Sequence, residues 1–295
     1  MIKDQQGLQD FQPKHEFFIG IDSDGCAFDT MEIKQKECFT PNTIKYWRLQ
    51  AVSKYARETV EFVNLYSKWR GTNRWPALLM VFDLLADRPE VIKRKVLMPE
   101  VPTLRAWVKT ETKLGNPALK AAVEKTGDPV LRQALAWSEA VNAAIEDMVK
   151  GIPPFPYVRE SLVAFASVAD MMVVSQTPGE ALQREWEEHD LAKHAAAICG
   201  QEMGSKTEHL KFGAGEKYAK DHVLMVGDAL GDLTAAQKNG FLFFPINPGS
   251  EDASWQRFFE EGMGRFLKGT FAGEYEKSLL AEFEALLPDR PPWRR

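Results

Sequence analysis

A short apolar run near the start of the chain leads directly into two aspartates, in the stretch Phe17-Phe18-Ile19-Gly20-Ile21-Asp22-Ser23-Asp24-Gly25. The five residues 17–21 predict a buried β-strand, because an apolar run of this length that stops at a turn signal is typical of a covered strand. The polar residues 22–25 that follow predict a sharp turn. The sequence therefore indicates a buried strand that carries two carboxylates at its carboxyl end.

Similar strands recur in the second half of the chain. Apolar runs that predict strands occupy residues 171–174, 223–226 and 241–244, with a weaker run at 197–199. Helical patterns beside these runs occupy residues 157–168, 178–188 and 230–238. Strands that alternate with helices predict βαβ units, so we expect a mostly parallel sheet with helices on both faces.

The stretch 31–155 differs from the rest, because no segment in it predicts a convincing strand. Helices are expected there at residues 43–67, 74–85, 102–110, 117–124 and 129–148. Two more helices are expected near the end of the chain, at residues 255–266 and 274–286. We therefore predict an α/β domain built from residues 1–30 and 156–295, into which an all-helical domain of residues 31–155 is inserted.

Composition and charge narrow the classes of function. The 295 residues have a net charge of −5 and contain no long basic run, which argues against a nucleic-acid partner. Three cysteines without a CxxC spacing favour neither a disulfide framework nor a zinc site. Residues 1–11 lack the apolar stretch of a signal peptide, and no apolar run is long enough to span a bilayer. We expect a cytoplasmic protein without a membrane partner, and the sequence leaves its oligomeric state open.

Acidic and hydroxyl side chains gather where the predicted strands end. Asp22 and Asp24 follow the first strand, Ser175 follows the second, and Asp228 and Asp232 follow the third. Ligands of open parallel sheets bind outside the carboxyl ends of the strands, so these residues should converge. Clustered carboxylates repel one another unless a cation neutralises them. Mg²⁺ suits such a site, because it binds a few carboxylates together with substrate phosphate.

Four segments, in this order, resemble the motifs of the haloacid dehalogenase superfamily. Residues 22–30 resemble the first motif, Val173-Val174-Ser175 the second, Lys206 the lysine of the third, and residues 227–232 (Gly-Asp-x-x-x-Asp) the fourth. The resemblance covers residues 17–245. It implies a Rossmann-like core and identifies the helical insertion as a cap domain.

The resemblance also implies a magnesium-dependent phosphohydrolase that forms an aspartyl-phosphate. Asp22 would be the nucleophile and a metal ligand. Asp24 would exchange protons with the leaving group and with water, and would bind the metal through its main-chain carbonyl. Asp228 would be the second carboxylate ligand, and Asp232 would act through a bound water or by orienting the lysine.

The remaining core residues would bind the phosphoryl group. Ser175 would hold the phosphoryl oxygens through its hydroxyl, with help from the main-chain N–H groups of Gln176 and Gly25. Lys206 would offset the negative charge on the nucleophile and the phosphoryl group. The family often has proline after this lysine and this chain does not, so Lys211 stays open as an alternative.

The insertion offers candidates for substrate specificity. The helix-breaking segment 70–76 contains Arg70, Asn73 and Arg74, which are suited to an anionic or hydroxylated group of a small phosphorylated metabolite. A solvated loop is the alternative interpretation. A phosphomutase would share every core residue, and a phosphonate-cleaving relative would need a lysine in the cap. A non-catalytic binding protein on the same fold should lack one of the first two aspartates, and both are present.

Overall fold

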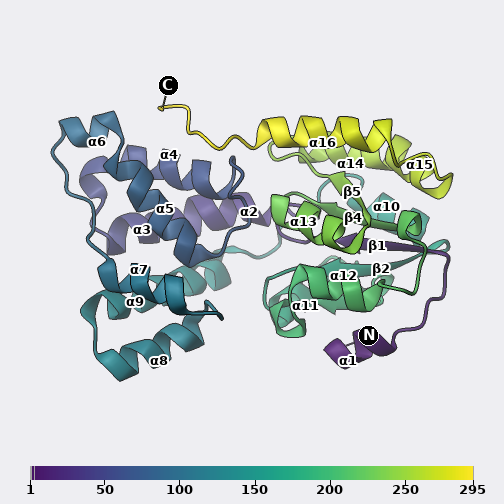
Figure 1. Cartoon of the computed structure of the whole chain (residues 1–295), viewed down its shortest axis with the longest axis horizontal. Helices are drawn as coiled ribbons and strands as arrows, with labels where there is room; N and C mark the ends of the chain where they lie inside the picture. Colours follow the sequence, from purple (N-terminus) through teal and green to yellow (C-terminus); the bar gives the residue numbers. More distant parts are fainter. Residues whose placement is uncertain (1, 3, 295) are drawn as a thin grey trace. The chain divides into compact units, whose positions relative to one another are not determined.

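The computed structural model describes residue 2 and residues 4–294, and it divides the chain into two compact units. Unit 1 comprises Met1–Met31 and Gly151–Leu287, and unit 2 comprises Glu32–Lys150 and Pro288–Arg295 (Figure 1). The strands lie in unit 1, and the described elements of unit 2 are helical. Within the described residues, no helix has the length and apolar character needed to cross a membrane.

Unit 1 is built on a five-stranded sheet in the order β3-β2-β1-β4-β5, and every neighbouring pair of strands is parallel. The strands are β1 (Phe17–Ile21), β2 (Ala169–Val174), β3 (Ala197–Cys199), β4 (Val223–Gly227) and β5 (Leu242–Pro245). Ile21 at the end of the central strand pairs with Val173 and Val226, so three neighbouring strands end at the same edge. The predicted α/β class with a parallel sheet is confirmed.

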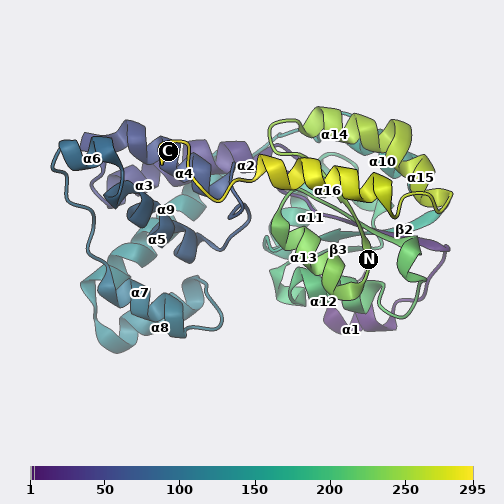
Figure 2. The same cartoon turned by 45° about the horizontal axis from the view of Figure 1, so that its top comes forward.

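Successive side chains of a strand point to opposite faces, and helices cover both faces of this sheet (Figure 2). Ile19 and Leu224 belong to one apolar core, and Phe18 and Met225 belong to the other. The helices of the first face include α10 (Val158–Phe165), α11 (Gly179–Glu188), α14 (Glu251–Arg257) and α15 (Met263–Leu267). Those of the second face include α1 (Gln5–Asp10), α12 (Lys206–Gly213) and α13 (Leu230–Asn239). The C-terminal helix α16 (Glu274–Leu286) contributes to both cores.

Unit 2 has its own apolar core, in which the rings of Trp107 and Trp137 both pack edge-on against Trp75, with centroids 5.4 and 5.6 Å away. Its helices include α3 (Thr40–Tyr46), α4 (Ser53–Asn64), α5 (Arg74–Ala86), α6 (Pro89–Lys93), α7 (Pro102–Thr110), α8 (Asn116–Thr126) and α9 (Pro129–Met148). Helix α2 (Thr30–Ile33) and a π-helical turn at Lys34–Phe39 precede them.

The single long helix predicted at residues 43–67 is wrong. Helix α3 ends at Tyr46, and a 3₁₀ turn at Gln50–Val52 leads into α4. Arg48 between them has a φ of +54°, which no α-helix accommodates. The apolar periodicity continues through the break because α3 and α4 bury side chains in the same core, so the pattern alone does not reveal the turn.

The C-terminal segment Pro288–Arg295 groups with unit 2, although the sequence assigned it to the α/β domain. The indole of Trp293 packs edge-on against Phe62 and lies 4.2 Å from the guanidinium carbon of the buried Arg88. Arg294 forms an ion pair with Asp87. A buried guanidinium covered by an aromatic face is a favourable cation–π arrangement, which accounts for the docking of this segment.

A buried carboxylate holds the segment that leads into the central strand β1. It lies at the amino-terminal ends of the strands, opposite to the candidate site. Asp170 near the start of β2 accepts hydrogen bonds from the main-chain N–H groups of Lys14 and His15, at 2.9 and 3.0 Å. The phenol of Tyr218 donates a third, at 2.7 Å. One side chain thus holds together the segment before β1, the strand β2 and the chain after α12.

We expect Asp170→Ala to destabilise unit 1, because it leaves buried donors without their acceptor. The free energy of unfolding should fall by roughly 2–4 kcal/mol. Urea unfolding monitored by tryptophan fluorescence measures this change, with Asp147→Ala, an exposed aspartate of α9, as the control. A loss below about 0.5 kcal/mol, the usual range for surface substitutions, would contradict the assignment.

Candidate active site

The first aspartate lies at the carboxyl end of the central strand. The N–H group of Asp22 donates to the carbonyl of Val226 at 3.0 Å, and its side chain is buried. Its Oδ1 accepts from the N–H group of Ser23 at 2.8 Å. The chain then turns at Gly25, which has a φ of +76°, a conformation that glycine adopts without strain. The turn leaves the second carboxylate oxygen, Oδ2, facing the neighbouring side chains.

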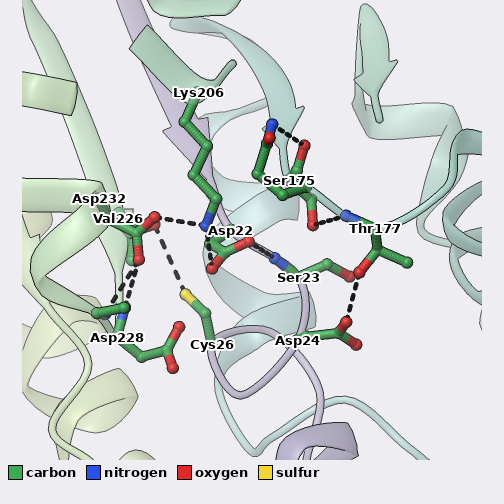
Figure 3. A network of polar contacts seen from close by, with 12 residues as sticks. Asp22, Ser23, Asp24, Cys26, Ser175, Thr177, Lys206, Val226, Asp228 and Asp232 are labelled. Carbon is green, nitrogen blue, oxygen red and sulfur yellow. Dashed lines mark hydrogen bonds and ion pairs between the residues drawn. The ribbon is translucent and has the colours of Figure 1, made fainter. Parts of the chain in front are cut away.

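One lysine joins two of the carboxylates. The ammonium group of Lys206 donates to Asp22 Oδ2 at 2.7 Å and to Asp232 Oδ1 at 2.5 Å (Figure 3). Helix α12 begins at this lysine, and Ser205 caps the helix with Glu208 in a capping box. The structure brings Lys206 to the carboxylates and leaves the alternative, Lys211, exposed in the last turn of the same helix.

The other two acidic residues follow β4. Carboxylate oxygens of Asp22, Asp228 and Asp232 lie within 4.8 Å of one another, and all three residues are buried. Asp232 Oδ2 accepts from the N–H groups of Asp228 and Ala229, at 3.2 and 3.0 Å. A Cβ atom on Gly227 would lie 2.5 Å from the Cβ of Asp232, so only glycine permits this close approach.

Burial and charge act together on this cluster. Burial raises the pKa of Asp22 well above its usual value, attraction to Lys206 opposes the shift, and repulsion by Asp232 and Asp228 adds to it. Burial also works against the ammonium of Lys206, but attraction to Asp22 and Asp232 prevails and raises the pKa of the lysine. The site therefore has an excess of negative charge that one lysine only partly offsets.

The donor set of this cluster fits a hard divalent cation. Buried carboxylate oxygens within reach of one another are the ligands that Mg²⁺ takes in proteins, usually together with water and phosphate oxygens. Nothing in the described cluster offers the thiolate or imidazole ligands that zinc prefers. Binding of a cation would also relieve the repulsion that raises the pKa of Asp22.

The second aspartate of the first motif is oriented differently. The carboxylate of Asp24 is half-buried and accepts hydrogen bonds from two threonines, from the hydroxyl of Thr30 at 2.5 Å and from that of Thr177 at 2.6 Å. Figure 3 shows the side chains of Asp24 and Thr177 facing each other, beside the buried cluster of Asp22, Asp228 and Asp232. The sequence indicated Asp24 but not Thr177, which lies two residues beyond the second motif.

The residues expected to bind a phosphoryl group lie beside this cluster. Ser175 follows β2 and is buried, and its hydroxyl accepts from the N–H group of Thr177 at 3.3 Å. The side chain of Gln176 is exposed and donates to the carbonyl of Gly204 at 2.9 Å. The N–H group of Gly25 donates to the carbonyl of Phe28 at 2.8 Å. This N–H group is used within the turn, and its expected contact with a phosphoryl oxygen stays a prediction.

Sequence reasoning also missed the support behind the first motif. The hydroxyl of Ser23, between the two aspartates, donates to Glu185 at 3.0 Å and accepts from the indole N–H of Trp186 at 2.9 Å. Both partners belong to α11, so this helix fixes the loop that carries Asp22 and Asp24. A serine in a turn predicts no particular partner, and the separation of more than 160 residues hides these contacts from local patterns.

The three residues of unit 2 that were predicted to bind substrate differ in their surroundings. Asn73 caps α5 by accepting from the N–H group of Trp75, and its amide donates to the carbonyl of Leu114 at 3.1 Å. Its expected contact with substrate stays a prediction. Arg70 is buried and donates to the carbonyl of Leu65 at 3.0 Å. Arg74 begins α5 rather than lying in a loop.

Arg74 lines a small cavity of about 10 Å³ inside unit 2. Its Nη1 donates to the hydroxyl of Ser138 and to the side-chain oxygen of Asn142, both at 2.7 Å, and its guanidinium lies over the ring of Phe39. Burial lowers the pKa of Arg74 to about 10, and the described residues offer it no carboxylate partner. It remains a cation held by neutral groups.

Solved structures similar to this chain are found at low sequence identity. Similar solved structures include a haloacid dehalogenase-like family hydrolase from Streptococcus pneumoniae (13% identity, TM-score 0.42, 81% of this chain and 90% of that chain). They also include such a hydrolase from Xanthomonas campestris (12%, 0.41, 86% and 97%) and a predicted phosphoglycolate phosphatase from Haemophilus somnus (16%, 0.41, 79% and 86%). These neighbours are haloacid dehalogenase-like hydrolases and phosphatases. No family model and no curated protein matches the chain.

A buried histidine near the lysine generates a prediction about stability. Burial, reinforced by the positive charge of Lys206, lowers the pKa of His209 to about 4. Between pH 6.5 and pH 4 the unfolded chain therefore takes up a proton at this residue and the folded chain does not. Stability must fall as the pH decreases through this window, by up to about 3 kcal/mol from this residue, with no contribution above it.

We expect His209→Gln to flatten the acid side of the stability profile. The free energy of unfolding, measured by urea titration from pH 7 to pH 4.5, should decrease less in the variant than in the original protein. Thr126→Val, at an exposed threonine of α8 that carries no titratable group, is the control and should keep the original slope. Parallel profiles for His209→Gln and the original protein would show that His209 does not titrate in this way.

Proposed function

We propose that the protein is a Mg²⁺-dependent phosphomonoesterase that transfers the phosphoryl group of a small metabolite to Asp22. One observation carries the proposal: the buried carboxylate of Asp22 ends the central strand, is bridged by Lys206 to Asp232, and lies within 4.8 Å of Asp228. Asp22 would be the nucleophile and Lys206 its counter-charge, and the cluster of three carboxylates would provide the site for a divalent cation. Their order along the chain is that of the motifs described above.

Asp22 and Asp228 would hold Mg²⁺ through their carboxylates, together with the main-chain carbonyl of Asp24. Asp232, whose oxygens are used by Lys206 and by two N–H groups, would orient the lysine and reach the ion through a water. When bound, Mg²⁺ supplies positive charge to the phosphoryl oxygens and to the attacking carboxylate.

In the first step, a carboxylate oxygen of Asp22 forms a bond to phosphorus as the bond from phosphorus to the leaving oxygen breaks. Asp24 enters protonated and gives its proton to the leaving oxygen, so an alcohol departs and Asp24 becomes a carboxylate. The hydroxyl of Ser175 and the main-chain N–H group of Gln176 would hold the phosphoryl oxygens, while Lys206 offsets their charge.

In the second step, a water oxygen attacks phosphorus and the bond from phosphorus to Asp22 breaks. The water gives a proton to the carboxylate of Asp24, which returns this residue to its starting state. Inorganic phosphate leaves, and Asp22 is a carboxylate again. Lys206 would keep Asp22 ionised before the first step and after the second, against the burial that raises the pKa of this residue.

The substrate would be a small molecule rather than a nucleic acid, since the net charge of −5 and the absence of a basic run offer no attraction to a nucleic-acid backbone. Arg70 and Arg74 of unit 2 would bind an anionic or hydroxylated group of this substrate, because Arg74 has no carboxylate partner among the described residues. We place the reaction in the cytoplasm, where the three buried cysteines would remain thiols.

The deciding experiment is a panel of phosphorylated metabolites assayed with Mg²⁺ and after removal of divalent ions by EDTA. Release of inorganic phosphate that disappears with EDTA and returns with Mg²⁺ supports the proposal. Transfer of phosphate within the substrate, seen only when a bisphosphate is added, would instead favour a phosphomutase. No turnover of any member under either condition would favour a non-catalytic binding protein.

We expect Asp22→Asn to lower kcat by at least about a thousandfold, because an amide cannot form the aspartyl-phosphate. Phosphate release from the best substrate of the panel measures the loss, and circular dichroism verifies the fold. Asp147→Asn, at an exposed position of α9, is the matched control and should keep the original rate. A rate for Asp22→Asn within tenfold of the original would rule out this residue as the nucleophile.

We expect Arg74→Met to weaken use of the metabolite more than hydrolysis of p-nitrophenyl phosphate, which offers no group for the arginine to bind. The value of kcat/KM for the metabolite should fall by roughly tenfold to a hundredfold, as for the loss of one charge-assisted hydrogen bond. Arg70→Met should behave likewise, and Arg132→Ala, at an exposed arginine of α9, should change neither substrate. Equal losses on both substrates would argue against a role in specificity.

A further inference from the structure

The carboxylate of Asp24 is held from both sides. Its Oδ1 accepts from Thr30, six residues further along the chain, and its Oδ2 accepts from Thr177, 153 residues away. The contact with Thr177 joins the loop after β1 to the loop after β2 and crosses between two segments of unit 1 (Figure 3). Together with the contact from Thr30, it fixes the orientation of this carboxylate.

The loop that carries Thr177 is itself fixed. The N–H group of Thr177 donates to the hydroxyl of Ser175 at 3.3 Å, and its carbonyl accepts from the N–H group of Gln201 at 3.2 Å. A Cβ atom on Gly200 would lie 2.8 Å from the carbonyl oxygen of Thr177 and 2.5 Å from the nitrogen of Gly179, so the chain segments here are in close contact. The hydroxyl of Thr177 therefore has a defined position.

The two hydroxyl donors act on different oxygens of the same carboxyl group. Thr177 donates to Oδ2 of Asp24 at 2.6 Å, and Thr30 donates to Oδ1 at 2.5 Å. Two donors on opposite oxygens restrict rotation of the carboxyl group, so they define the direction in which it points.

We propose that Thr177 is a positioning residue that aims the carboxyl group of Asp24 at the leaving oxygen. The inference rests on the function proposed above, in which Asp24 delivers a proton to that oxygen. It adds that the loop after β2 has two tasks, since Ser175 would hold the phosphoryl group and Thr177 directs the acid. Both side chains belong to one short segment, so this segment would set the position of the proton donor relative to the phosphoryl group.

The role of Thr177 can be tested by comparing leaving groups. An alkyl phosphate needs a proton on its leaving oxygen, whereas p-nitrophenolate leaves readily without one. Thr177→Val removes the hydroxyl at almost constant volume. We expect kcat/KM for the alkyl phosphate to fall by roughly tenfold to a hundredfold, as for a misplaced catalytic group, and kcat/KM for p-nitrophenyl phosphate to fall by less than about threefold.

Three further variants sharpen the comparison. Thr177→Ser keeps the hydroxyl and should restore the alkyl phosphate to within about threefold of the original value. Thr177→Ala removes the hydroxyl without adding a branched apolar group and should repeat the effect of valine. Thr126→Val, at an exposed hydroxyl of α8, is the matched control and should leave both substrates unchanged. Thermal melting verifies that each variant is folded.

Each outcome has one meaning. Equal losses on both substrates, or no loss on either, would overturn the positioning role of Thr177 while the original enzyme still hydrolyses both in a Mg²⁺-dependent manner. Failure of serine to restore the alkyl phosphate would also overturn it. If the original protein hydrolyses neither substrate with Mg²⁺ present, the proposed function itself fails, and the role of Thr177 fails with it.

Discussion

The contact between the ammonium group of Lys206 and the carboxylates of Asp22 and Asp232 is the interaction on which the site depends. Three buried carboxylates that close together would repel one another strongly, and each would tend to take up a proton. One lysine reduces this repulsion but does not cancel it. The residual negative charge would attract a divalent cation, so the proposed function depends on this incomplete charge balance.

The parallel sheet makes this arrangement possible. Ile21, Val173 and Val226 lie side by side, so the loops that follow β1, β2 and β4 start from neighbouring points. Each loop then needs only a few residues to bring its polar groups together. Gly227 allows the close approach of Asp232, and Gly25 allows the turn after the first strand. The strand order therefore places the three loops near one another, and the two glycines allow the polar side chains to come into contact.

The sequence predicted the sheet and the acidic cluster well, because each strand is a compact apolar run and because Asp22 and Asp228 directly follow two of these runs. It did not predict the break at Arg48, since residues on both sides of the break bury side chains in the same core and preserve the periodicity. It also missed Thr177, whose partner Asp24 lies 153 residues away. Hydrogen bonds between segments far apart in the chain, or within a tight turn, leave no signal in local patterns.

The docking of Trp293 has a consequence for the topology of the whole chain. The polypeptide passes between the units three times, after Met31, after Lys150 and after Leu287. The helical unit is therefore not an autonomous insert that could be excised as one continuous fragment. A peptide restricted to residues 32–150 would lose the indole that covers Arg88 and expose a cation that the fold keeps buried. The last of the three crossings gives the helical unit a second, separate piece of chain, and that piece supplies the aromatic cover of a buried cation.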